Sequence, residues 1–157
     1  MPRTIFLYVF LVTLLITGCG SFSTPAPLNT PKPESPALDG DWTIKMTQSG
    51  GIIGLSRSIE VSSDGKYTVV DERANKTVTG ELTANELVEL NELVVTSNHV
   101  PATKPDGSVC ADCFVYDLEI QVNGEKLSVQ LNDFTLPNSG LEPLVTYLRG
   151  LIDTALK

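Results

Sequence analysis

Residues 114–132 read FVYDLEIQVNGEKLSVQLN, two runs of alternating apolar and polar residues joined by Asn123-Gly124. Alternation with a period of two places the apolar side chains on one face of a strand. An Asn-Gly pair readily adopts the positive φ angles that a two-residue hairpin turn requires. The stretch therefore predicts an antiparallel hairpin with one buried face. The apolar residues of that face are Phe114, Tyr116, Leu118, Ile120, Val122, Leu127, Val129 and Leu131.

The segment before this hairpin contains further alternating runs. The turn sequence Ser62-Ser63-Asp64-Gly65 separates two of them and predicts a second hairpin. Gly80 lowers the strand propensity of the last run, so that strand is predicted to be short and weak. The sequence thus predicts four further strands: at 41–48, around Ile59 and Val61, at 66–70 and, more weakly, at 77–82.

Two amphipathic helices complete the predicted domain. The spacing Thr83-Ala84-Asn85-Glu86 is that of a capping box and predicts the start of the first helix. Its apolar stripe consists of Leu87, Leu90, Leu93 and Val94. The stripe of the C-terminal helix consists of Leu141, Leu144, Val145, Leu148, Leu151, Ile152 and Ala155. The predicted fold class is α+β: an antiparallel sheet of about five to six strands from hairpins, with both helices packed on one face and the other face polar.

Composition excludes several classes of function. The 157 residues suffice for one domain, and 11 basic against 19 acidic residues give a net charge of −8. No basic surface is available to neutralise phosphates, so no nucleic-acid partner is expected. The single histidine argues against most hydrolytic triads and against zinc sites with several histidines.

The N-terminus is typical of an exported lipoprotein. Residues 1–18 contain a basic residue, Arg3, followed by a short apolar run, as in a signal peptide. The end of this segment, residues 15–19, resembles a bacterial lipobox, in which a cysteine is lipidated before cleavage. We therefore expect lipidation at Cys19. Two alternatives remain open: a plain secretory signal with an incidental Cys19, and a short membrane anchor, although about twelve apolar residues fall short of the roughly twenty that span a bilayer.

The organisation predicted from these features has three parts. They are a signal peptide at 1–18, lipidated Cys19 with a Pro-rich tether at 19–37, and a folded α+β domain at 38–157. Acyl chains would anchor the protein to a membrane of the bacterial cell envelope, on its extracytoplasmic side. The tether would act as a spacer.

Cys110 and Cys113 are the remaining cysteines, and a disulfide between them is the simplest interpretation in an exported chain. Because a disulfide needs Cα atoms at roughly 4.4–6.8 Å, residues 110–113 would have to form a turn. Two alternatives are a redox Cys-x-x-Cys pair and a zinc site that includes His99. The first lacks a following helix, and the second lacks a fourth ligand.

No other pattern indicates catalysis. The glycines at 50–54 are not followed by the Gly-Lys-Ser/Thr of a phosphate-binding loop, and no Gly-x-Ser-x-Gly nucleophile motif is present. Acidic pairs such as Asp71-Glu72 lie in predicted turns, where solvated charges are common. We therefore expect no enzyme activity, and assign no catalytic residues, no metal ligands and no cofactor.

The stretch Ser49, Gly50, Gly51, Ile52, Ile53, Gly54 places two large aliphatic residues among glycines, between two predicted strands. One interpretation is a bulge or sharp crossover that buries both isoleucines in the core. The other is a recognition loop that offers bare backbone and an apolar plug to the cleft of a partner.

From Trp42 to Leu156 the sequence resembles the emfourin family, small bacterial protein inhibitors of thermolysin-like metallopeptidases such as protealysin. The similarity is carried by the strand and loop at 44–54 with Arg57 after it, by the helix at 83–94, and by the strand at 112–118 with the hairpin and helix that follow. The chain departs from the family pattern in its lipobox, its tether, its Cys110/Cys113 pair and extra residues around 64–80.

The resemblance implies inhibition of a secreted metallopeptidase by a rigid protein wedge that needs no metal of its own. Ile52 or Ile53 would then fill the apolar pocket that such peptidases use for the residue after the scissile bond, with Gly50-Gly51 lying flat over the zinc. The alternative is a non-catalytic envelope lipoprotein whose domain serves as a binding or scaffold module for another partner.

Overall fold

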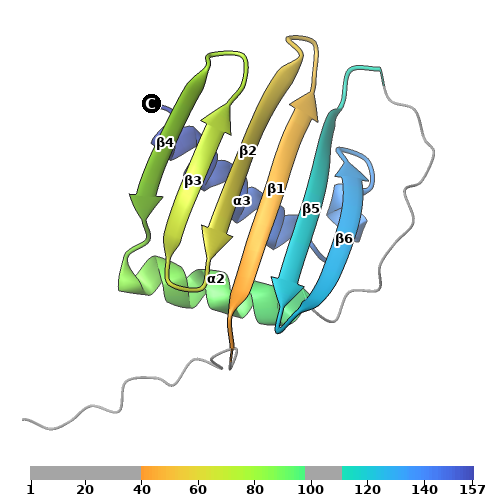
Figure 1. The fold of residues 1–157 in the computed structure, drawn as a ribbon. Helices are drawn as coiled ribbons and strands as arrows, with labels where there is room; N and C mark the ends of the chain where they lie inside the picture. Colours follow the sequence, from red (N-terminus) through yellow and green to blue (C-terminus); the bar gives the residue numbers. More distant parts are fainter. Residues whose placement is uncertain (1–39, 98–110) are drawn as a thin grey trace, which may run out of the picture. The chain divides into compact units, whose positions relative to one another are not determined.

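The computed structural model describes residues 40–97 and 111–157. The described part is an α+β domain with a six-stranded antiparallel sheet and two helices packed on one face (Figure 1). This confirms the predicted fold class. The predicted signal peptide, Cys19, the whole of the 19–37 tether, His99 and Cys110 lie outside the described residues.

The sheet has the strand order β4-β3-β2-β1-β5-β6 (Figure 1). Its strands are β1 (Trp42–Gly50), β2 (Leu55–Ser62), β3 (Lys66–Asp71), β4 (Lys76–Glu81), β5 (Phe114–Val122) and β6 (Glu125–Asn132). Three hairpins connect β1 to β4, and the predicted Asn123-Gly124 turn connects β5 to β6, with both residues at positive φ. The long-range pairing places β1 beside β5, with Trp42 opposite Val122 and Gly50 opposite Phe114.

Helix α2 (Ala84–Ser97) begins at the predicted capping box. The backbone N–H of Thr83 donates to Glu86 Oε2 at 2.7 Å, and the Thr83 hydroxyl donates to the same oxygen at 2.7 Å. These hydrogen bonds from Thr83 lower the pKa of Glu86. The first bond satisfies the Thr83 N–H, and the Glu86 N–H donates back to Thr83 Oγ1 at 3.4 Å, so two N–H groups that the start of the helix leaves without partners within the helix are paired.

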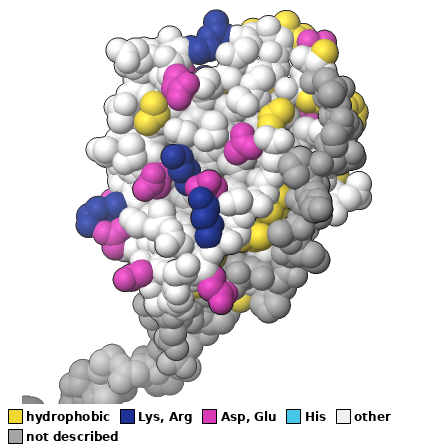
Figure 2. Space-filling model, turned by 45° about the vertical axis from the view of Figure 1, so that its right-hand side comes forward, with side chains coloured by type: hydrophobic (Ala, Val, Ile, Leu, Met, Phe, Trp, Pro, Cys, Tyr) yellow, Lys and Arg dark blue, Asp and Glu magenta, His cyan; other side chains and the backbone are white. Residues whose placement is uncertain are grey.

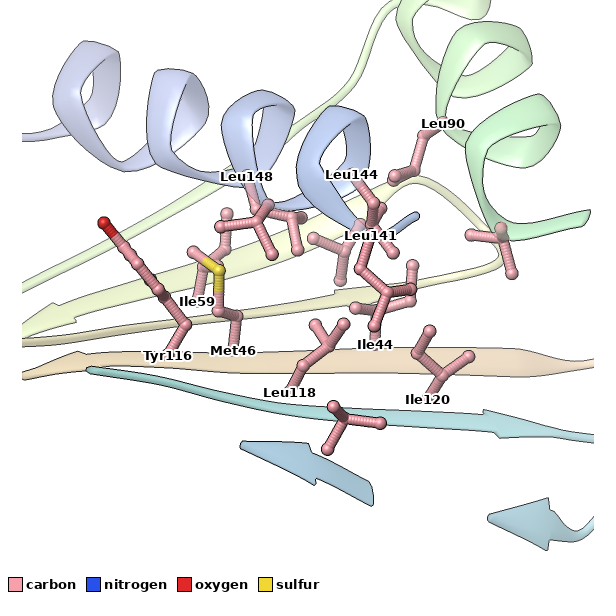
Figure 3. Packing of buried hydrophobic residues seen from close by; sticks show 14 of the residues in the cluster. Ile44, Met46, Ile59, Leu90, Tyr116, Leu118, Ile120, Leu141, Leu144 and Leu148 are labelled. Carbon is pink, nitrogen blue, oxygen red and sulfur yellow. The ribbon is translucent and has the colours of Figure 1, made fainter. Parts of the chain in front are cut away.

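The core lies between the sheet and the two helices (Figure 3). Helix α3 (Glu142–Ala155) follows a short 3₁₀ turn, η1 (Leu136–Asn138), and carries Pro143 in its first turn, where proline is tolerated. Alternate residues of β1, β2 and β5 are buried, as the sequence pattern predicts. The largest fully buried side chains include Ile44, Met46, Ile59, Leu90, Tyr116, Leu118, Ile120, Leu141, Leu144, Leu148 and Ile152.

One polar contact ties α2 to the sheet, and another ties the two helices to each other. The indole N–H of Trp42, a residue only 3% exposed, donates to Asn91 Oδ1 on α2 at 2.9 Å. The Tyr147 hydroxyl on α3 donates to the Glu86 carbonyl at 3.0 Å, and burial raises the pKa of Tyr147 to about 12. Both contacts let an aromatic ring be buried without leaving its polar atom unpaired.

The face of the sheet opposite the helices is polar, as predicted. Figure 2 shows basic and acidic side chains scattered over the side of the domain turned toward the viewer, with few hydrophobic side chains between them. The Lys126 ammonium, for example, lies 3.0 Å from Glu119 Oε1 across β5 and β6. Within the described residues, no helix combines the length and apolar character needed to cross a bilayer.

Replacing Asn91 with Ala should lower the free energy of unfolding by about 1–3 kcal/mol, because the buried indole N–H of Trp42 loses its acceptor. Urea unfolding followed by Trp42 fluorescence measures the change. Glu89→Ala, on the exposed side of the same helix, is the matched control and should change stability by less than about 0.5 kcal/mol. Equal effects of the two substitutions would contradict the assignment.

Candidate functional site

The predicted recognition stretch forms the tip of the β1–β2 hairpin. Ser49 and Gly50 are the last residues of β1, and Gly51–Gly54 form the turn before β2. Ile52 is 89% exposed and Ile53 is 65% exposed. The alternative in which both isoleucines enter the core is therefore wrong.

Three glycines give the loop its path. Gly50, Gly51 and Gly54 have φ angles of +92°, +68° and +59°, in the region that side chains other than glycine rarely adopt. A Cβ atom on Gly50 would lie 2.5 Å from the backbone oxygen of Cys113, and one on Gly51 would lie 2.6 Å from the ring of Phe114. The first two glycines thus allow the loop to lie directly against the beginning of β5.

The loop is held at both of its ends. On one side the N–H of Gly51 donates to the Cys113 carbonyl at 3.0 Å, which continues the β1·β5 ladder beyond the last paired residues. On the other side Arg73 Nη1, in the β3–β4 turn, donates to the Gly54 carbonyl at 3.4 Å. Within the loop the N–H of Gly54 donates to the Gly51 carbonyl at 2.9 Å. These contacts fix the backbone and leave the two isoleucine side chains in solvent.

A charged network supports the loop from the helix side of the sheet. Arg57 Nε lies 2.9 Å from Asp71 Oδ2, and its Nη1 lies 3.4 Å from Asp153 Oδ1 on α3. The Asp71 carboxylate also accepts a hydrogen bond from the backbone N–H of Ala74 at 2.9 Å. That hydrogen bond, together with the Arg57 guanidinium, lowers the pKa of Asp71.

A shallow hollow lies between the loop and the β3–β4 turn. Ile53 forms part of its wall, whereas the almost fully exposed Ile52 projects from the tip of the hairpin. The hollow is lined by Ile53, Leu55, Arg57, Asp71, Arg73 and Ala74.

The cysteine predictions fall partly outside the described residues. Cys113 is buried immediately before β5, and its carbonyl belongs to the loop support described above. Cys110 lies outside the described residues, so the Cys110/Cys113 disulfide stays a prediction. The same holds for lipidation of Cys19.

Phe134 is a surface residue that the sequence reasoning missed. It lies between β6 and η1, is 69% exposed, and is the third large hydrophobic residue that the described part of the chain exposes, after Ile52 and Ile53. The available signal was the same as for Ile52 and Ile53, an apolar residue within a polar turn sequence, Asn132-Asp133-Phe134-Thr135.

The chemistry that the loop itself offers is that of shape and apolar contact. The stretch Ser49–Gly54 contains no titratable side chain. Among residues 40–97 and 111–157, no group of three or more His, Cys, Asp or Glu residues is arranged to hold a metal ion. The sequence matches no protein-family model and no curated protein.

Replacing Gly50 with Ala should destabilise the domain by about 2–4 kcal/mol, because the new Cβ adds a clash with the Cys113 carbonyl to the cost of a positive φ. Gly54→Ala is the matched control. Its φ is also positive, but nothing lies within 4 Å of the new Cβ, so about 1–2 kcal/mol is expected. Chemical denaturation measures both, and equal losses would show that Gly50 is not pressed against β5.

Replacing Asp71 with Asn should destabilise the domain at neutral pH, and this difference should shrink in acid. The pKa of Asp71 is lowered in the folded state, so its charge stabilises the fold above the ordinary carboxyl pKa of about 4. That contribution is lost as the pH falls through the lowered value. Urea midpoints of both proteins between pH 7 and pH 2.5 test this, and a difference that stays constant over the range would contradict it.

Proposed function

We propose that the domain is an inhibitor of a secreted thermolysin-like metallopeptidase and that the β1–β2 loop is the part that enters the peptidase cleft. The observation that carries this proposal is the exposure of Ile52 and Ile53 on a hairpin tip whose backbone is held at both ends. Exposed aliphatic residues are common one at a time, but two adjacent ones at the tip of a constrained loop favour a binding role.

Constraint of the loop favours tight binding. A flexible loop loses conformational entropy when it enters a cleft, and a loop already fixed in the free protein avoids much of that cost. The hydrogen bond from Gly51 to Cys113 and the contact from Arg73 to Gly54 provide this fixation. The charged network of Arg57, Asp71 and Asp153 supports the strands beneath.

The residues of the loop suit an apolar pocket beside a catalytic zinc ion in the target. Ile52 or Ile53 would fill the pocket for the residue after the scissile bond. Gly50 and Gly51 have no side chains, so their backbone would lie flat over the zinc. Complete burial of one isoleucine contributes about 1.5–3 kcal/mol, which corresponds to roughly a ten- to hundredfold gain in affinity.

The location that we propose is the extracytoplasmic side of the bacterial envelope. Lipidated Cys19 would anchor the chain, and the proline-rich segment 19–37 would hold the domain away from the membrane surface. An inhibitor placed there would meet secreted peptidases close to the cell. No catalytic residue, metal or cofactor of its own enters this proposal.

Replacing Ile52 with Asp should weaken inhibition by at least about a hundredfold, because a carboxylate would have to be desolvated inside the apolar pocket or directly beside an Ile53 that fills it. The full chain, purified in mild detergent, is titrated against thermolysin and other thermolysin-like peptidases with a small peptide substrate. Because Ile52 is 89% exposed, its replacement should leave the unfolding midpoint within experimental error of wild type.

Asn85→Asp is the matched control. It adds the same charge at an exposed position in the first turn of α2, where a helix N-terminus tolerates it. Its inhibition constant should equal that of wild type. A wild-type chain that inhibits none of the peptidases would contradict the proposal and favour a binding or scaffold module for another partner.

A further inference from the structure

The three large hydrophobic residues that the described part of the chain exposes, Ile52, Ile53 and Phe134, belong to one end of the sheet. Gly50, at the base of the β1–β2 loop, pairs with Phe114 at the start of β5. The next residue of β5, Val115, pairs with Asn132 at the end of β6, and Phe134 follows two residues later. The ends of β1 and β6 are thus two strand spacings apart, about 10 Å.

Phe134 is presented by a turn with an ordered backbone. The N–H of Phe134 donates to Asn132 Oδ1 at 2.9 Å, and the Thr135 N–H donates to the same oxygen at 3.0 Å. Asp133 connects the turn to β5, because its carboxylate accepts from the Phe114 N–H at 2.8 Å and from the Tyr116 hydroxyl at 3.1 Å. The ring of Phe134 nevertheless remains 69% exposed.

One residue couples this turn to the β1–β2 loop. Phe114 gives its N–H to Asp133, and its ring lies against Gly51, where a Cβ atom would come within 2.6 Å of it. The two apolar projections therefore stand on a common support and keep a fixed spacing. Two projections held on one support before binding can contact a single partner surface without the entropic cost of ordering each of them.

The β1–β2 loop alone is too small to form the whole interface of a tight complex. A stable protein–protein complex buries about 800 Å² on each partner, more than a four-residue loop tip supplies. The β3–β4 turn on one side of the loop offers Glu72, Arg73, Ala74 and Asn75, with no large apolar side chain. On the β5 side, Phe134 is an exposed aromatic of the kind that often dominates binding energy.

We propose that Phe134 is a second anchor of the inhibitor, packing on the rim of the peptidase cleft beside the pocket that takes Ile52 or Ile53. This inference rests on the function proposed above. It assigns the contact surface to the β1–β2 loop and the 133–135 turn together, with Phe114 between them. Loss of this anchor increases the dissociation rate more than it reduces the association rate.

The test compares inhibition constants and dissociation rates of full-chain variants against the peptidase that wild type inhibits best. Phe134→Ala should raise the inhibition constant at least tenfold, mainly through faster dissociation. Phe134→Tyr, which keeps the aromatic face, should stay within about threefold of wild type. Glu125→Ala removes an exposed side chain at the opposite end of β6 and should have no effect.

The outcomes separate the two proposals. If wild type inhibits, Ile52→Asp does not, and Phe134→Ala equals wild type, the second anchor is refuted and the proposed function stands. A wild type that inhibits no peptidase refutes the proposed function and this inference with it. Unfolding midpoints of all variants equal to wild type would exclude a folding defect; a lowered midpoint for Phe134→Ala alone would show that the ring is structural and would overturn the inference.

Discussion

The pairing of β1 with β5 is the constraint on which the rest of the domain depends. It joins two segments far apart in the sequence, in register from Trp42 opposite Val122 to Gly50 opposite Phe114. Because β1 is also paired with β2, it is hydrogen-bonded along both sides, and its inward side chains lie at the centre of the core. The same ladder continues for one more bond into the β1–β2 loop, from Gly51 to Cys113. The core and the candidate site are therefore products of one register, and a shift in it would disturb both.

Local patterns in the sequence were sufficient to predict the six strands and the two α-helices, but not the short η1 turn. Asn123-Gly124 predicted the last hairpin because two residues decide the conformation of that turn. The Thr83/Glu86 spacing predicted the start of α2 because a capping box lies within one turn of helix.

The strand order was not predictable in the same way. No local signal says that β1 lies next to β5, since that choice depends on how the apolar faces of all six strands and both helices fill a common volume. Even the weak strand containing Gly80 is part of the sheet, because β4 pairs along its whole length with β3.

The position of the candidate site could be predicted from the sequence, but the sequence could not decide whether its isoleucines are buried or exposed. Two isoleucines flanked by glycines are compatible with burial or with exposure, and both interpretations were open. The structure decides between them through neighbours that the sequence does not reveal. Phe114 occupies the space beneath Gly51, and the backbone of Cys113 lies against Gly50, so these contacts leave the loop no path back into the core. Phe134 was missed for a related reason. A single apolar residue in a turn does not indicate a binding surface by itself, and only the fold places Phe134 at the same end of the sheet as Ile52.

Charged groups close the core at this end, where the apolar interior would otherwise meet solvent. Arg57 bridges Asp71 on β3 and Asp153 on α3, and the guanidinium of Arg149 lies 5.6 Å from the centre of the Tyr116 ring. The Tyr116 hydroxyl in turn donates to Asp133, beside Phe134. Strands and helix are thus joined by polar contacts directly under the two exposed apolar projections. Each such contact contributes modestly to the free energy of unfolding. Hydrogen bonds and bidentate ion pairs are directional, however, and so they also fix the orientation of the segments that they join. Asp133 ties the 133–135 turn to β5 through Phe114 and Tyr116, and Gly51 ties the β1–β2 loop to the residue just before the same strand. The loop and the turn therefore share one support at this end of the sheet.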